Sequence, residues 1–317
     1  MPAFTTTDGR ELTIVPGFRE AVLRGRPSGT PTAAWTQADY DLAATRRVVA
    51  ARRRIADARL ALGQPGPLRA LDIGCGAGLE SVIAAADRVG EVIALDRVPA
   101  LLAPGDRGTR AHRLVTAALA AAGSALNSRA ALAELPLQVR AADAAALGLA
   151  DDSIDLVWSR AALEHLQPLD ATLRELTRVV RPGGIAHHVI DPYFWVKGCH
   201  AGGLIDIPWA HARLAPEDFA RAALQIAGAR RGVRRAQFVT SLNRLGIAAW
   251  RVALLASGPW DLVSWSVESS SLARSLLGEH PEVADTVLAG VTGPDLVSQS
   301  ITAILRLRDP GKFHAEV

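Results

Sequence analysis

The sequence has few cysteines and no long apolar run. Cys75 and Cys199 are the only cysteines in 317 residues, and Cys75 falls inside a glycine-rich turn, so a disulfide-stapled fold is not expected. Arg, Asp or Gly interrupts every apolar stretch before it reaches the ~18–20 residues that a membrane-spanning helix needs. The first residues show no basic segment followed by an apolar block, so no signal peptide is expected. We therefore expect a cytoplasmic protein without a membrane partner.

Lysine is also scarce, because it occurs only at positions 197 and 312 among 35 basic residues. A net charge of +3 carried by arginine, in an alanine-rich chain, is more typical of a GC-rich genome than of a nucleic-acid partner. One arginine cluster spans residues 46–54, where apolar residues recur at helical spacing and place the arginines on the solvent face of a helix. A second cluster, at 230–235, either solvates a helix in the same way or binds an anionic acceptor.

Short apolar runs alternate with helical patterns from residue 68 onward. This alternation predicts βαβ units and a parallel sheet. The expected strands are Leu68–Ile73, Glu91–Asp96, Leu137–Ala142, Ile154–Ser159, Gly184–Asp191, Trp260–Val267 and Gln299–Leu307. We predict an α/β fold with a doubly wound, mostly parallel, seven-stranded Rossmann-like sheet, an N-terminal helical cap and a lid insertion.

Helical patterns lie between these strands. We expect helices at about 37–62, Leu79–Arg88, Leu169–Val180 and Asn243–Ala256. Residues 97–138 exceed what one crossover helix needs, and their Ala/Leu pattern predicts two helices divided near Gly123 and Ser124.

The chain is predicted to divide into four parts around one core. Residues 1–67 form an N-terminal cap and helix, and 68–191 form the ligand-binding half of the core. Residues 192–239 form a lid that binds the second substrate, and its first part, 192–219, is rich in aromatics, Gly and His without a clean period. Residues 240–317 complete the core.

The strongest chemical signal is a strand that runs into a glycine turn and then a helix, at Leu71–Gly78. Glycines allow a ligand to approach the backbone closely, and ligands of open α/β sheets bind at the carboxyl ends of the strands. Asp96, at the end of the next strand, can accept hydrogen bonds from both hydroxyls of a ribose. The order is G-x-G-x-G, with Leu79 where a dinucleotide-binding turn has its third glycine. A ligand without phosphates is therefore favoured over a nicotinamide cofactor.

Four ordered motifs extend this pattern over residues 68–191. They read LDIGCGAG, IALD, AADAAALGLADDSIDLVWSRAALEHL and RELTRVVRPGG. With them the chain resembles the type 11 S-adenosylmethionine-dependent methyltransferases of class I, the group that includes quinone-biosynthesis methyltransferases. The resemblance implies S-adenosyl-L-methionine as the cofactor and methyl transfer as the activity.

The resemblance also implies which residues hold the cofactor. Its methionine half would lie against Asp72, Gly74, Gly76 and Gly78, its ribose at Asp96, and its adenine at Asp143 and Ala144. Cys75, Arg97 and Ser159 complete the expected cofactor-binding set, with Cys75 as a small packed residue and not a nucleophile.

Transfer to a hydroxyl requires a base, and histidine is the usual one. Histidines concentrate between the fourth strand and the lid, at 165, 187, 188, 200 and 211. We expect the base to be His165, or His188 oriented by Asp191. Strand alternation places His187 and His188 on opposite faces, so at most one can serve.

Three alternatives qualify this prediction. The residues after the fourth strand, Ser159–Ala162, lack the Asn/Asp-Pro-Pro-aromatic turn of amino-nucleobase methyltransferases, which favours oxygen over nitrogen or carbon and argues against DNA as substrate. A metal site built from His187, His188, Asp191, His200 and Asp206 matches no standard spacing, so no metal is expected. A non-catalytic cofactor-binding homologue and an oxidoreductase remain as other classes. We expect a small-molecule acceptor, no nucleic acid, and either a monomer or a homodimer.

Overall fold

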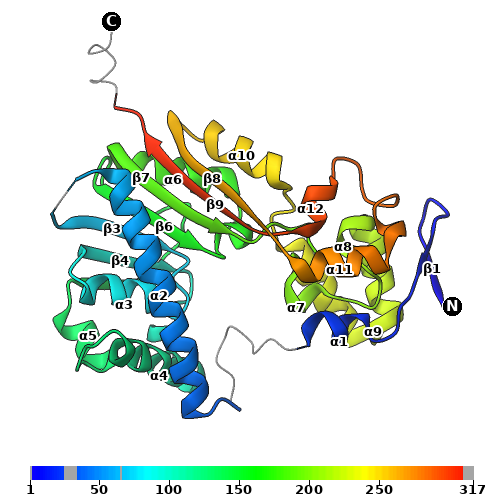
Figure 1. The fold of residues 1–317 in the computed structure, drawn as a ribbon, viewed down its shortest axis with the longest axis horizontal. Helices are drawn as coiled ribbons and strands as arrows, with labels where there is room; N and C mark the ends of the chain where they lie inside the picture. Colours follow the sequence, from blue (N-terminus) through cyan, green and yellow to red (C-terminus); the bar gives the residue numbers. More distant parts are fainter. Residues whose placement is uncertain (1, 25–33, 65, 310–317) are drawn as a thin grey trace, which may run out of the picture.

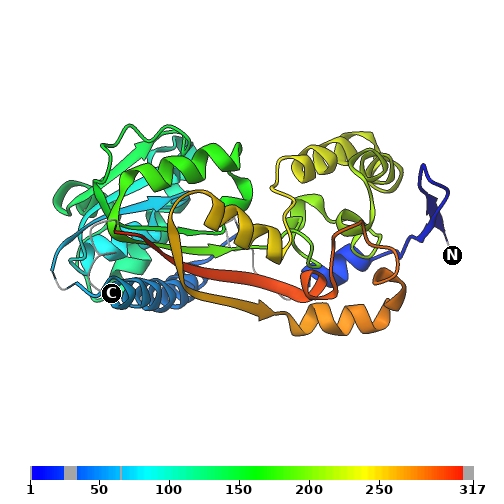
Figure 2. The ribbon, with the colours of Figure 1, turned by 90° about the horizontal axis from the view of Figure 1, so that it is seen from above.

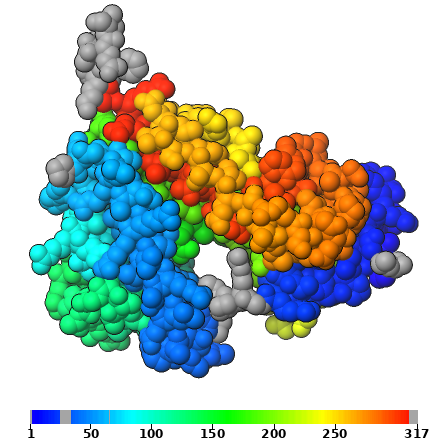
Figure 3. Space-filling view, in the orientation of Figure 1, coloured from blue at the N-terminus to red at the C-terminus, as the bar shows by residue number. Residues whose placement is uncertain are grey.

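The computed structural model describes residues 2–24, 34–64 and 66–309. They form two lobes, one built around a large β-sheet and the other mainly helical (Figures 1 and 2). The sheet lobe comprises residues 34–64, 66–191, 243–269 and 298–309, and the helical lobe comprises 2–24, 192–242 and 270–297. Figure 3 shows the two lobes joined on the side of the last two strands and separated on the side of the long N-terminal helix.

The sheet lobe contains a seven-stranded sheet in the order β5-β4-β3-β6-β7-β9-β8. Its strands are β3 (Leu68–Ile73), β4 (Gly90–Asp96), β5 (Leu137–Ala141), β6 (Ile154–Arg160), β7 (Val180–Ile190), β8 (Trp260–Ser269) and β9 (Ser298–Leu307). Neighbouring strands pair in parallel from β5 to β7, and β9 pairs antiparallel with both β7 and β8. The predicted mostly parallel α/β sheet is confirmed.

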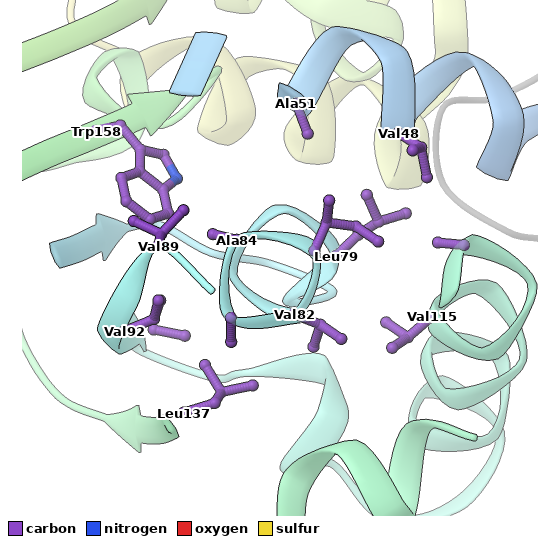
Figure 4. Close-up of a cluster of buried hydrophobic side chains, with 14 of the residues drawn as sticks. Val48, Ala51, Leu79, Val82, Ala84, Val89, Val92, Val115, Leu137 and Trp158 are labelled. Atoms are coloured by element: carbon purple, nitrogen blue, oxygen red, sulfur yellow. The ribbon is translucent and has the colours of Figure 1, made fainter. Parts of the chain in front are cut away.

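Helices cover both faces of this sheet. On one face lie α2 (Gln37–Leu62), α3 (Leu79–Ala86), α4 (Gly105–Ala121) and α5 (Ser128–Glu134), and on the other α6 (Leu169–Val179) and α10 (Ile247–Ala256). The two helices predicted within 97–138 are therefore present. Figure 4 shows how the helices α2, α3 and α4 pack against one another. Val48 of α2, Leu79 and Val82 of α3 and Val115 of α4 belong to one buried cluster.

Local sequence explains where α2 begins and ends. Thr36 and Asp39 form a reciprocal capping box at its start, and Gly63 ends it in the left-handed conformation (φ 69°), which costs glycine little. Of its arginines, Arg52 and Arg53 are exposed as predicted, but Arg54 and Arg47 are partly buried. Arg54 turns inward because Glu80 of α3 lies within ion-pairing distance. The prediction that the whole cluster faces solvent is therefore wrong for Arg47 and Arg54.

The helical lobe has a hydrophobic core of its own. It contains the hairpin β1 (Ala3–Thr5) and β2 (Glu11–Thr13) with the helices α1 (Phe18–Leu23), α7 (His200–Gly203), α8 (Ala210–Arg213), α9 (Pro216–Thr240), α11 (Ser271–Glu279) and α12 (Gly293–Val297). Phe4 and Phe18 pack there with Trp209 and Phe219. The amide of Thr7 also donates to the Asp218 carboxylate at 3.1 Å, across 211 positions of sequence.

The predicted N-terminal cap is thus divided between the lobes. Residues 2–24 join the helical lobe, whereas α2 packs on the sheet. The predicted lid, 192–239, forms about half of the helical lobe and packs against residues before and after it in sequence. Within the described part of the chain, no helix combines the length and apolarity needed to cross a bilayer.

Candidate active site

The glycine turn is shaped for close approach at the carboxyl end of β3. Gly74, Gly76 and Gly78 all have positive φ, at 70°, 54° and 69°, which is costly for other residues. A side chain at Gly74 would meet Cβ of Ala162 at 2.4 Å, whereas a Cβ at Gly76 would project into open space. The turn is therefore closed behind Gly74 and open in front of Gly76, where a ligand can lie.

Hydrogen bonds tie this turn to the end of β4. The amides of Gly74 and Cys75 donate to the carbonyl of Leu95, at 2.8 and 3.0 Å. The amide of Gly76 donates to Oδ2 of Asp96 at 3.0 Å, and that of Val98 donates to Oδ1 at 2.9 Å. Asp96 is thus held rigidly beside the turn before any ligand binds.

Two cavities meet at the glycine turn. The smaller, of about 370 Å³, is lined by Asp96, Arg97, Asp143, Ala144 and His165 among others. Oδ1 of Asp143 accepts from the amide of Ala145 at 2.9 Å. Arg97 and Asp143 lie 3.4 Å apart on the exposed rim. Four predicted cofactor residues thus share one concave surface with the predicted base His165.

The larger cavity, of about 740 Å³, lies on the other side of the turn. Its lining includes Asp72, Cys75, Glu80, Asp191 and His200 together with four arginines, at 47, 107, 110 and 160. Both cavities are lined by Gly74, Gly76 and Ala161. A single elongated ligand can therefore extend from one cavity into the other.

Buried acids and a paired arginine network line the floor of this larger cavity. Burial, and the neighbouring Glu80, raise the pKa of Asp72 to about 7, and Oγ of Ser81 donates to it at 2.6 Å. Burial alone would also raise the pKa of Glu80, but Arg160 and Arg54 hold it below its usual value. Nε of Arg160 donates to Glu80 at 2.6 Å. Sequence reasoning missed this network, because its members come from α2, α3 and β6.

The predicted histidines are distributed unequally. His165 ends a short 3-10 helix, η2 (Leu163–His165), and its ring stacks on that of His200 with centroids 5.0 Å apart. Loss of water around the ring, and the imidazole of His200, lower the pKa of His165 to about 4. His200, which belongs to the helical lobe, thus meets His165 where the two cavities approach each other.

His188 lies elsewhere. It is 2% exposed and its Nδ1 is 2.9 Å from Oγ of Ser159, which is itself buried. Burial, with His187 beside it, lowers the pKa of His188 to about 3. Neither His188 nor Ser159 lines the two cavities, whereas Asp191 does. Burial therefore removes His188 from the candidates for the base and Ser159 from the side chains facing the cofactor.

Cys75 lines the larger cavity, and burial raises the pKa of its thiol. A thiol held protonated is a poor nucleophile. This agrees with the packing role expected for it.

Part of the chain is similar in sequence to known proteins. Residues 71–187 match the family described as a methyltransferase domain. A malonyl-[acyl-carrier protein] O-methyltransferase of Methylococcus capsulatus is 34% identical over 162 residues, which cover 49% of this chain and 50% of that protein. A malonyl-[acyl-carrier protein] O-methyltransferase of Pseudescherichia vulneris is 35% identical over 133 residues, covering 42% and 43%. The matched part of the chain thus spans about half the length of these curated relatives.

Solved structures with similar folds include a phosphoethanolamine N-methyltransferase 2 of Haemonchus contortus in complex with phosphomonomethylethanolamine and S-adenosylhomocysteine. It is 14% identical, with a TM-score of 0.46, covering 81% of this chain and 53% of that one. The family match and the curated relatives make residues 71–187 a class I methyltransferase domain. Over these residues the match is to the type 11 group, and it indicates S-adenosylmethionine as the cofactor.

Proposed function

We propose that this chain transfers the methyl group of S-adenosylmethionine to an oxygen atom of a small-molecule acceptor. The observation that carries the proposal is the pair of cavities that share Gly74, Gly76 and Ala161 as walls. One has carboxylates placed for an adenosine, and the other has room and charge for a methionine and a second substrate.

The cofactor would lie across the glycine turn. Its ribose would bind Asp96, its adenine would lie at Asp143 and Ala144, and its methionine would extend past Gly76 toward Asp72. The sulfonium methyl group would then lie where the cavities meet, near His165 and His200. Methyl transfer is an in-line displacement, so holding both partners in that geometry can supply about 7–11 kcal/mol of the barrier.

Two observations favour an oxygen acceptor. The curated relatives are O-methyltransferases by name, and the stretch after β6 lacks the amine-holding Pro-Pro-aromatic turn. Arg107 and Arg110 of α4 line the larger cavity, so an acceptor that carries negative charge would be attracted there. The acceptor can be free or attached to a carrier. Of the two predicted bases, His165 is the one whose side chain lines a cavity at this junction, where its ring stacks on that of His200.

The test is transfer of an isotope-labelled methyl group from S-adenosylmethionine to a panel of acceptors. The panel would contain hydroxylated acids and a malonyl group on an acyl carrier protein. We expect label in an ether or ester product, and much less label with the Asp96→Ala variant at a cofactor concentration that does not saturate it. Binding of S-adenosylhomocysteine without transfer to any acceptor would favour the non-catalytic homologue. Binding of NADH without S-adenosylhomocysteine would favour the oxidoreductase.

We also propose a cytoplasmic location, because Cys75 and Cys199 are both free thiols, as a reducing compartment keeps them. A small-molecule acceptor leaves no role for nucleic acid. Light scattering would decide between a monomer and a homodimer.

A further inference from the structure

Three metal-ligating side chains converge at the junction of the cavities. Glu164 and His165 are adjacent on η2, and His200 begins α7 on the helical lobe. One carboxylate oxygen and one ring nitrogen from each histidine all lie within 4.8 Å of one another. The ligand atoms of one zinc ion, each about 2.0–2.2 Å from it, lie up to roughly 4 Å apart. Small side-chain rotations would therefore bring these three atoms onto one cation.

Glu164 is the clearest sign that something is bound here. Its side chain is 2% exposed, and no described side chain donates a hydrogen bond to either carboxylate oxygen. The nearest donors are the backbone amides of Glu164 and Asp191. The carboxylate of Asp191 is close enough to interact with that of Glu164 electrostatically. Burying a carboxylate without a paired cation is costly, and a neighbouring carboxylate increases the cost. A cation at this position would offset both.

His200 carries a second, independent sign. Its Nε2 is buried and has no hydrogen-bond partner among the described residues. Its backbone is left-handed, with φ of 48°, a conformation that is strained in a non-glycine residue and concentrates at functional sites. The strained turn presents the imidazole to His165 and Glu164.

We propose that Glu164, His165 and His200 bind one divalent transition-metal cation. Two imidazoles and one carboxylate suit Zn²⁺, Mn²⁺, Fe²⁺ or Co²⁺, and three protein ligands leave positions open. Because His165 lines the smaller cavity and His200 the larger, the open positions face the place where donor and acceptor meet. Of the five residues considered from sequence as metal ligands, only His200 belongs to this site.

The use of the cation rests on the proposed function, although its binding does not. An acceptor hydroxyl that binds the cation loses its proton to water more readily, because the positive charge stabilises the alkoxide. The oxygen lone pair then forms a bond to the methyl carbon. The carbon–sulfur bond breaks with its electron pair remaining on sulfur, which gives the O-methyl product and neutral S-adenosylhomocysteine.

The test is titration of Co²⁺ into the full chain after dialysis against a chelator, followed by visible absorption and calorimetry. We expect one Co²⁺ per chain and no thiolate charge-transfer band. Glu164→Gln and His200→Asn should each weaken binding at least tenfold. The control is His112→Asn, because His112 lies on α4, where its ring bonds Ser128 at 2.9 Å, and this variant should bind Co²⁺ like the parent.

Absence of saturable Co²⁺ binding would overturn the proposal, and so would equal binding by the parent and both cluster variants. Retained affinity for S-adenosylhomocysteine would show that the variants are folded. Co²⁺ binding without methyl transfer would refute the proposed function and leave the metal site standing. Undiminished methyl transfer by chelator-treated enzyme that binds no Co²⁺ would refute the metal site and leave the proposed function standing.

Discussion

At the scale of single residues, Asp96 joins the cofactor site to the fold. It accepts hydrogen bonds from Gly76 and Val98 while its outer lone pairs face the smaller cavity. We expect Asp96→Ala to weaken S-adenosylhomocysteine binding by about 1.5–3 kcal/mol, or roughly ten- to a hundredfold. Calorimetry measures this directly. Asp106→Ala, on an exposed carboxylate of α4, is the matched control, and equal affinities of the two variants would contradict the cofactor assignment.

Asp72 should make stability depend on pH. Its pKa is about 7 in the folded chain and about 3.9 when unfolded. Between these values the folded state holds a proton that the unfolded state has lost, so the folded state loses stability as the pH rises through this window. Asn cannot titrate but still accepts from Ser81. Asp72→Asn should therefore gain roughly 2–3 kcal/mol relative to the parent between pH 5 and pH 8.

Urea unfolding without cofactor at the two pH values measures this gain. Asp106→Asn, with its carboxylate 91% exposed in the parent, should show no such change with pH. A difference between Asp72→Asn and the parent that stays constant from pH 5 to pH 8 would show that Asp72 is already ionised in the folded chain.

Some of the site could be predicted from sequence because its geometry is local. The glycine turn and Asp96 follow from one strand-turn-helix unit and the next strand end. The contact of His165 with His200 could not be predicted, since it joins residues from different lobes. Strand alternation correctly placed His187 and His188 on opposite faces of β7. It could not predict that the ring of His188 would be buried in hydrogen-bonding contact with Ser159 of the neighbouring strand.

At the scale of elements, α9 departs furthest from what its sequence indicated. It runs from Pro216 to Thr240 and bends at Gly228, where φ is 74° and ψ is 167°. The sequence predicted no separate helix over this stretch. The bend interrupts the spacing of its buried residues, with Phe219 and Ala222 before it and Gly232 and Val239 after it. The sheet helices α2, α3, α6 and α10, in contrast, contain no such bend, and the sequence predicted their bounds to within a few residues.

The bend gives a test at one position. Gly228 occupies a region of backbone space that is essentially restricted to glycine, so Gly228→Ala should destabilise the protein by about 1–3 kcal/mol. Gly278 of α11 is helical and has open space around it, so Gly278→Ala should be neutral or stabilising by up to about 1 kcal/mol. Chemical denaturation compares the two. Equal stability of both variants would mean that α9 can straighten at no cost.

At the scale of the whole molecule, the site is assembled from two lobes whose hydrophobic cores are separate. The helical lobe draws its core from residues 2–24, 192–242 and 270–297, which lie too far apart in sequence for periodicity to join them. That is why the sequence predicted a cap and a lid in place of one lobe. The larger cavity takes His200 from this lobe and Arg107 and Arg110 from the other, so binding of the second substrate depends on how the lobes meet.

Separate cores predict that the cofactor stabilises one lobe more than the other. The proposed adenosine contacts all belong to the sheet lobe. S-adenosylhomocysteine at about 100 times its Kd should therefore raise the free energy of opening measured by hydrogen exchange in that lobe by up to about 2.7 kcal/mol. Slowly exchanging amides of β3, β4 and β6 should gain this protection. Those of residues 204–214, most of which are buried in the core of the helical lobe, should gain much less. The Asp96→Ala variant at the same ligand concentration should show smaller gains in both lobes.

Equal gains in both lobes of the parent would show that the two lobes unfold as one unit, because protection of an amide reports the opening that exposes it. In that case the strands β8 and β9, which run between the lobes (Figure 2), would couple them tightly enough for a cofactor on one side to hold the acceptor-binding side closed.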